Sequence, residues 1–142
     1  MADTSLFRFK TPLQMRWSDC DMLGHVNNAV YLTYCEQSRT EYCNHLGWDW
    51  QEEGIILAKV EIDFKKPLLY TDKPFIYTRV SRLGNKSFEM ETLIVAEKKE
   101  QPELVAVIRS ILVMWHYKTN VTFPISAEIR EKIKAFEGQD FA

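Results

Sequence analysis

The spacing of apolar residues switches between two periods along this chain, and this switch constrains the fold more than any other feature of the sequence. Between residues 28 and 46, one set of side chains recurs every three or four positions, which is the spacing of one face of an α-helix about five turns long. Its members are Tyr31, Cys35, Ser38 and Tyr42, followed by His45 or Leu46. In four other segments apolar and polar side chains alternate, which is typical of half-buried β-strands. These segments are residues 7–17, 59–65, 75–83 and 88–96.

A fifth strand is predicted over Leu104–His116, which is apolar on both faces and therefore suits the centre of a sheet. Residues 84–87 have the composition of a hairpin turn between two of the strands. Asn27 is a suitable N-cap for the long helix, and Gly47 a suitable stop. Ser126 is expected to cap a small C-terminal helix. The pattern predicts an α+β domain, with one long helix against a five-stranded antiparallel sheet, spanning residues 1–142 without a division.

The first strand carries two further expectations. Phe7, Phe9, Leu13, Met15 and Trp17 fall on one side of it and are expected to share a buried face. A proline at position 12 interrupts the polar side and suggests an edge or a bulge.

Composition excludes several classes of function. Eighteen basic and twenty acidic residues give a net charge of −2, which provides no attraction to nucleic acid. No apolar stretch approaches the roughly 20 residues needed to span a membrane. The first ten residues hold no apolar signal segment, and three cysteines without C-x-x-C spacing predict neither a disulfide framework nor a zinc site. We therefore expect a cytoplasmic protein with reduced thiols and no bound metal.

The densest group of polar side chains lies in the segment before the long helix, where two acids, a glycine, a histidine and two asparagines fall within residues 19–28. A helix N-terminus presents unpaired N–H groups and a partial positive charge, and it can stabilise an oxyanion. An acid four residues from a histidine can provide a base or nucleophile beside a proton carrier. Taken alone, each of these residues is more simply structural, since Asp and Asn are ordinary helix caps and Gly24 allows a positive φ, so the prediction of a site depends on the whole group.

The motif D-x-D-x-x-G-H-V-N-N-x-x-Y over residues 19–31, followed by E-x-x-R-x-E over residues 36–41, resembles the 4-hydroxybenzoyl-CoA thioesterase-like branch of the hotdog superfamily. The predicted order of elements is also the hotdog order. The resemblance implies hydrolysis of an acyl-thioester, acyl-CoA or acyl-carrier-protein, at a site shared by two subunits. It implies no metal and no cofactor, and a homodimer or a dimer of dimers.

The resemblance also assigns roles to residues. The catalytic carboxylate of the family matches Asp21, which would attack the thioester carbonyl or activate water toward it. Backbone N–H groups at Asn27 and Asn28 match those that polarise the carbonyl. His25 would orient Asp21 or the water, and Tyr31 is expected near the acyl group.

Three departures from related patterns leave the role of His25 open. Acyl-carrier-protein thioesterases with a similar run have an asparagine where this chain has Leu23. Another bacterial group has a histidine at the position of Asn28, and a third uses a helix carboxylate, for which Glu36 is the nearest match. A hydroxyacyl-thioester dehydratase or hydratase, and a non-catalytic acyl-binding protein, are the alternative functions.

The surrounding charges allow further expectations. Arg16 is expected to pair with Asp19 and hold the loop, while Arg39, Glu36 and Glu41 are expected to form a surface or interface network. Phosphate groups of coenzyme A would need nearby cations. The sequence does not choose among six candidates, which are Lys59, Lys65, Lys66, Arg79, Arg82 and Lys86.

Overall fold

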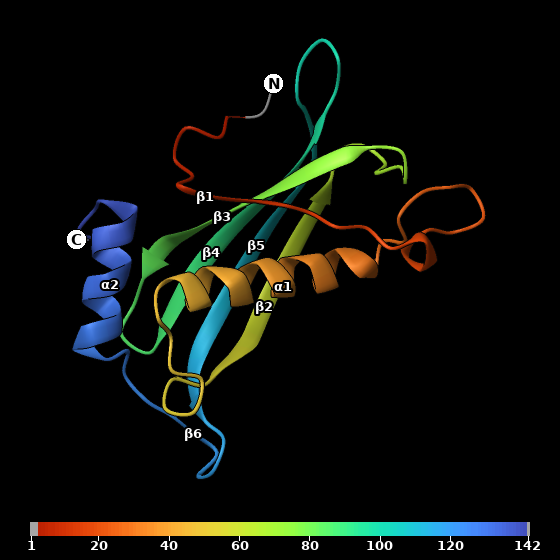
Figure 1. The fold of residues 1–142 in the computed structure, drawn as a ribbon. Coiled ribbons are helices and arrows are strands. Elements are labelled where there is room, and N and C mark those ends of the chain that lie inside the picture. The colour runs from red at the N-terminus through yellow and green to blue at the C-terminus, as the bar shows by residue number, and fades with distance from the viewer. Residues whose placement is uncertain (1–2, 142) are drawn as a thin grey trace.

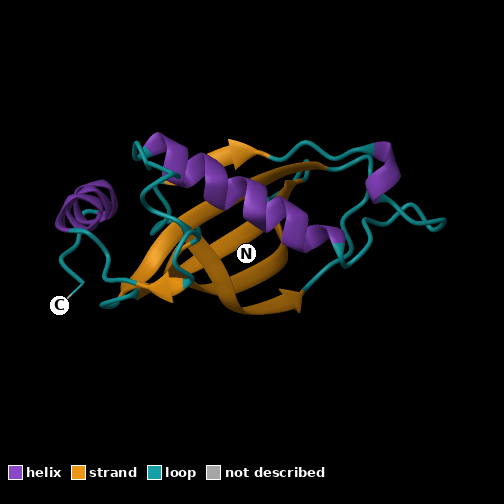
Figure 2. Cartoon of the chain, turned by 90° about the horizontal axis from the view of Figure 1, so that it is seen from below, coloured by secondary structure: helices purple, strands orange, loops and turns teal. Residues whose placement is uncertain are grey.

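A long helix, α1 (Val30–His45), crosses the concave side of a curved antiparallel sheet in the computed structural model, which describes residues 3–141 (Figures 1 and 2). The strands run in the order β1-β3-β4-β5-β2, so β1 and β2 form the two edges. Their bounds are β1 (Phe9–Pro12), β2 (Ile55–Phe64), β3 (Lys73–Leu83), β4 (Ser87–Glu97) and β5 (Glu103–His116). A short strand β6 (Val121–Thr122) pairs with the end of β5, and α2 (Ala127–Glu137) packs beside the sheet. The predicted α+β architecture is confirmed, including the central position of β5.

The first strand is shorter than predicted because its regular pairing with β3 ends at Pro12. Leu13 N still donates to Pro74 O (3.0 Å), but the chain then leaves the sheet and forms a short 3₁₀ turn, η1 (Trp17–Asp19). Trp17 is 78% exposed, so the prediction that it joins the buried face is wrong. Strand β2 is longer than predicted: it begins at Ile55, and a bulge interrupts its pairing with β5 between Leu57 and Lys59.

Two of the three predicted helix ends are found at the expected residues. Helix α1 begins two residues later than predicted and its N-cap is Ala29, so the prediction of Asn27 as N-cap is wrong. Asn27 instead orders the turn before the helix, since its side-chain oxygen accepts from Ala29 N (3.0 Å) and its carbonyl from Val30 N (2.9 Å). Gly47 follows the helix with a φ of +75°, a conformation that favours glycine. The Ser126 hydroxyl accepts from Ile129 N (3.2 Å), which confirms the predicted cap of α2.

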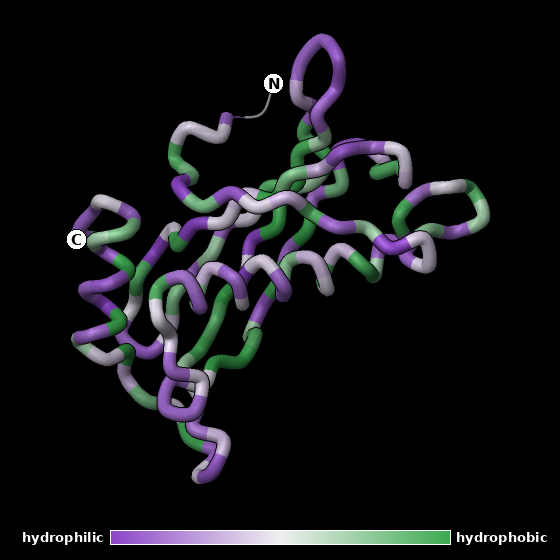
Figure 3. Tube along the Cα trace, in the orientation of Figure 1, coloured by the Kyte–Doolittle hydropathy of each residue, from purple (hydrophilic) through white to green (hydrophobic). Residues whose placement is uncertain are grey.

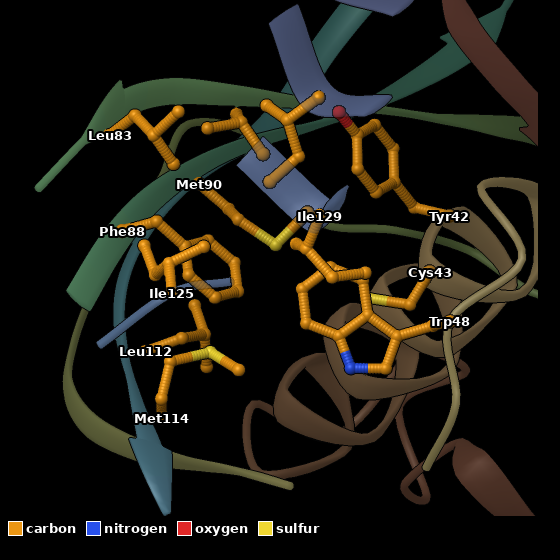
Figure 4. Packing of buried hydrophobic residues seen from close by; sticks show 12 residues of the cluster. Tyr42, Cys43, Trp48, Leu83, Phe88, Met90, Leu112, Met114, Ile125 and Ile129 are labelled. Atoms are coloured by element: carbon orange, nitrogen blue, oxygen red, sulfur yellow. The ribbon is translucent and has the colours of Figure 1, made fainter. Parts of the chain in front are cut away.

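Two apolar clusters fill the space beneath α1. One joins the C-terminal half of α1 to α2 and includes Tyr42, Trp48, Phe88 and Ile129, which point toward one another in Figure 4. The other lies under the N-terminal half of α1 and includes Cys35, as predicted. Figure 3 shows apolar residues concentrated along the strands, whereas α1 is mixed along its length.

The buried face of α1 meets the sheet through polar contacts as well as apolar ones. The Ser38 and Thr78 hydroxyls are hydrogen-bonded, and the Cys35 thiol lies 3.8 Å from the hydroxyls of Thr92 and Ser110. These groups are buried, so each bond compensates for lost hydration. These paired polar atoms therefore fix the position of α1 along the sheet, relative to β3, β4 and β5.

Candidate functional site

The segment between η1 and α1 is a tight hairpin. Asp21 N donates to His25 O (2.8 Å), and Asn27 N donates to Asp19 O (2.9 Å). The turn between them closes with Gly24 N donating to Asp21 O (3.1 Å), and Gly24 has a φ of +79° that other residues adopt only with strain. Two bonded pairs of residues thus fix the separation between the acid and the start of α1.

A buried carboxylate anchors the base of this hairpin. Asp19 is 3% exposed and accepts hydrogen bonds from the Tyr34 hydroxyl (2.7 Å), from Arg16 N (2.9 Å) and from the Arg16 guanidinium (3.2 Å). Burial alone would raise the pKa of Asp19, but the bonds from Tyr34 and Arg16 and the charge of Arg16 outweigh it, so the pKa is lowered. The expected Arg16–Asp19 pair is present, and Tyr34 is a partner that sequence reasoning missed.

The same hairpin is attached to the connection between β2 and β3. Val26 N donates to Leu68 O (2.8 Å), and Tyr70 N donates to Gly24 O (3.4 Å). Leu68 is fully buried, which makes it a firm attachment point. The hairpin and the start of α1, which follow one another in sequence, therefore meet the distant β2–β3 connection at one end of the sheet (Figure 1).

A pocket of about 500 Å³ opens where these segments meet, within the size range of small-molecule sites. All five residues predicted for the site line it: Asp21, His25, Asn27, Asn28 and Tyr31. The remaining lining residues are Val26, Phe64, Lys65, Lys66 and Pro67. The structure therefore brings together the whole predicted set, and it adds the end of β2.

The Asp21 carboxylate is held by the main chain. One of its oxygens, Oδ1, accepts from Leu23 N (2.9 Å) and from His25 N (3.2 Å). Within residues 3–141 the other oxygen, Oδ2, has no hydrogen-bond donor, and the His25 imidazole has no hydrogen-bond partner. Asp21 is exposed to solvent and His25 half-buried, so both are accessible from the pocket. His25 therefore contacts Asp21 through its backbone and not through its ring.

The backbone donors at the start of α1 are nearly all used. Asn27 N is bonded to Asp19 O, and Tyr31 N donates to Asn28 O (3.3 Å). Ala29 N and Val30 N are both satisfied by Asn27. Among the described residues Asn28 N has no acceptor. Of the two backbone N–H groups expected to be free for a ligand, those of Asn27 and Asn28, only that of Asn28 is therefore unbonded. Asn27 contributes by ordering this turn.

Tyr31 and Phe64 form the aromatic part of the pocket lining. Their ring centroids are 5.0 Å apart with an interplanar angle of 82°, a favourable edge-to-face contact. Tyr31 is buried, but Phe64 is 47% exposed. The alternation of β2 placed Phe64 with the inward-facing Val60 and Ile62, so its role in the pocket was not apparent from the sequence.

Two helix residues lie apart from the pocket. Glu36 is exposed and lines a separate depression with Glu41 and does not line the pocket beside Asp21. Arg39 is only 9% exposed, and no ion pair joins it to either glutamate in the described part of the chain. The expected surface network fails because Arg39 lies on the buried face of α1, one position beyond Ser38.

The structure also shows where the candidate cations lie relative to the pocket. Of the six, Lys65 and Lys66 line it. Arg79, Arg82 and Lys59 are engaged with Glu91, Glu89 and Glu61 respectively. Residues 3–141 contain no cluster of three or more His, Cys, Asp or Glu side chains arranged to hold a metal ion, and none of their helices is long and apolar enough to cross a membrane.

The enclosure of α1 by the curved sheet is the hotdog fold, and the polar hairpin at the start of α1 places the chain among the hotdog proteins that act on thioesters. Residues 15–133 match the model of the thioesterase-like superfamily, and the chain belongs to this family. The prediction of a hotdog thioester hydrolase is confirmed.

Three known proteins show the extent of the similarity. A thioesterase from Thermus thermophilus, solved with coenzyme A and zinc, is 36% identical with a TM-score of 0.83, over 94% of this chain and 96% of that one. The long-chain acyl-CoA thioesterase FadM of Escherichia coli is 25% identical over 88% of this chain and 96% of its own. A 4-hydroxybenzoyl-CoA thioesterase variant solved with 4-hydroxybenzoyl-CoA shares the fold, with a TM-score of 0.82 at 17% identity over 88% of this chain and 97% of that one.

Proposed function

We propose that this protein hydrolyses acyl-coenzyme A to the free acid and coenzyme A in the pocket beside Asp21. The observation that carries the proposal is the presence, in one pocket, of a carboxylate with a free oxygen and a backbone N–H with no acceptor among the described residues. The similarity to thioesterases that act on or bind coenzyme A derivatives supports the substrate class.

The proposed mechanism assigns one task to each group. Asn28 N–H donates to the thioester oxygen, and the positive end of α1 stabilises the negative charge that develops there. Asp21 Oδ2 either removes a proton from water that attacks the carbonyl carbon, or attacks that carbon itself to form a mixed anhydride that water then hydrolyses to the free acid. In both routes the C–S bond breaks and coenzyme A leaves as the thiolate, and the His25 ring orients the water or Asp21. Val26, Tyr31 and Phe64 provide apolar surface for the acyl group.

The functional unit is proposed to be a homodimer, alone or paired into a tetramer. Strand β2 is ten residues long and forms an edge of the sheet, and exposed edges favour pairing with a second chain. Large apolar side chains close to the pocket are exposed in the single protomer: Trp17 78%, Met22 101%, Leu23 79% and Phe64 47%. A second subunit would cover this surface and help to close the pocket. The three free thiols, Cys20, Cys35 and Cys43, suit a reducing compartment such as the cytoplasm.

An Asp21→Asn variant tests the proposal. Asparagine keeps the size of the side chain and an oxygen for Leu23 N, but it can neither attack nor accept a proton efficiently. Thiol release from short, medium, long and aromatic acyl-CoAs should fall by about 10²–10⁴ in kcat. Asp49→Asn, a change at an exposed acid outside the pocket, is the matched control. Retention of more than a fifth of wild-type kcat by Asp21→Asn would refute the assignment.

A further inference from the structure

We propose that Lys65 and Lys66 bind the phosphate-bearing end of coenzyme A, and that they make the enzyme select for coenzyme A thioesters over thioesters without a nucleotide. This inference rests on the proposed function, because it identifies the thiol carrier for the same site. It begins where β2 ends. Four successive residues, Phe64 to Pro67, line the pocket, and two of them are the lysines.

The backbone explains this arrangement. Lys65 N and Lys66 N both donate to one acceptor, Val105 O, at 2.8 and 3.1 Å. Regular pairing between β2 and β5 stops at Phe64, opposite Ala106. Two successive amides on a single carbonyl end the regular ladder, and they hold the backbone of both lysines beside the pocket. Pro67 follows directly and fixes the exit of the chain.

Lys66 connects the pocket to a second hollow. That hollow is lined by Lys66 and by residues 98–104 of the β4–β5 hairpin, which lies at the same end of the sheet as the start of α1 (Figure 1). The two hollows share Lys66, so a ligand longer than the pocket that passes this lysine would reach the hairpin. Coenzyme A has this form, with the thiol and the phosphates at opposite ends of a flexible pantetheine arm.

The charges along this course favour an anion. Within residues 3–141, Lys65, Lys66 and Lys99 make no ion pair, whereas Lys98 is paired with Asp72. Asp21 is the only acid that lines the pocket, and Glu100 and Glu103 are the acids of the second hollow. The whole chain has a net charge of −2, whereas the unpaired lysines make the pocket mouth locally positive. Lysine is well suited to phosphate as a mobile point charge.

The test compares substrates with the same acyl group on coenzyme A and on pantetheine, which lacks the nucleotide. In the double variant Lys65→Gln/Lys66→Gln, the loss of kcat/KM on acyl-CoA should exceed the loss on acyl-pantetheine by about tenfold. Added salt should reduce the wild-type preference for acyl-CoA in the same direction. Lys118→Gln is the matched control, since Lys118 is exposed in the turn between β5 and β6, at the opposite end of β5.

Titration with free coenzyme A and with pantetheine gives a readout that does not require hydrolysis. The double variant should bind coenzyme A about tenfold more weakly than wild type does, with little change for pantetheine. If the double variant loses equally on coenzyme A and on pantetheine, or loses on neither, the inference is overturned. Hydrolysis of acyl-CoA by wild type would still uphold the proposed function in that case. A selective loss on acyl-carrier-protein would also overturn the inference, in favour of a protein carrier. If wild type hydrolyses no thioester, the proposed function fails, and the two titrations still decide whether these lysines bind phosphate.

Discussion

Replacing Tyr34 with phenylalanine should loosen the catalytic hairpin without altering the pocket lining. The change removes one hydroxyl, which donates to Asp19 Oδ2 over 2.7 Å, and keeps the ring that packs against Tyr31. Asp19 and Tyr34 are 3% and 5% exposed, so water does not readily replace the lost donor. A hydrogen bond to a buried charged group contributes about 1.5–3 kcal/mol, which corresponds to a decrease in Tm of about 4–10 °C for a domain of this length.

The effect on stability should depend on pH with a definite sign. The pKa of Asp19 is lowered in the folded protein, so its stabilising contribution is present above the unfolded pKa and is lost as pH falls through the folded pKa. Without the Tyr34 hydroxyl the pKa of Asp19 should rise toward its ordinary value. The difference in stability between wild type and variant should therefore be largest at neutral pH and should shrink in acid.

Denaturant unfolding at neutral pH and at about pH 3 measures this difference, and Tyr70→Phe serves as control because Tyr70 is 47% exposed. Because Asp19 O holds Asn27 N, and Asn27 orders the turn that presents Asn28 N, kcat should also fall, though less than in Asp21→Asn. The reasoning is refuted if Tyr34→Phe unfolds like wild type at neutral pH, or if its deficit grows in acid.

Two further predictions concern the histidine and the assembly. His25→Ala should lower kcat by roughly 10–10², less than Asp21→Asn, because both backbone bonds between residues 21 and 25 survive and only the imidazole is lost. Steady-state kinetics checks this, and a larger loss than in Asp21→Asn would make histidine the principal base and favour the dehydratase alternative. Light scattering at micromolar concentration should give at least twice 16.7 kDa, since a lone protomer leaves Met22 and Leu23 uncovered. An active monomer would contradict the shared-site proposal.

The parts of the fold that follow local rules were predictable from the sequence. The helical spacing before Gly47 and the double-sided apolar run of β5 each have one physical interpretation, and both were confirmed. The prediction of the first strand was wrong because the alternation in the sequence continues past the residue at which the strand ends. Alternation persists to Trp17, but regular pairing with β3 ends at Pro12 and the chain leaves the sheet after the bond from Leu13 N to Pro74 O.

The candidate site was predictable where it depends on one contiguous segment and unpredictable where distant segments meet. Residues 19–31 contain the acid, the histidine and the helix start, so all five predicted residues line one pocket. Tyr34 as partner of Asp19 could have been suspected only from its place one turn after Tyr31 on the same helix. Available N–H groups could not be counted in advance, because the bond from Asn27 N to Asp19 O exists only once the hairpin has closed.

Which cations lie at the pocket could not be predicted either, because this also depends on contacts between distant segments. Six lysines and arginines were equivalent in the sequence because each lies in a strand or turn with alternating neighbours. Lys65 and Lys66 differ from the others in lining the pocket, where their amides share one acceptor, Val105 O, beyond the end of β2. Arg79 and Arg82 are paired with glutamates across the β3–β4 pair, a pairing that depends on register. Both differences arise from the pairing of strands, which the local sequence around each cation does not contain.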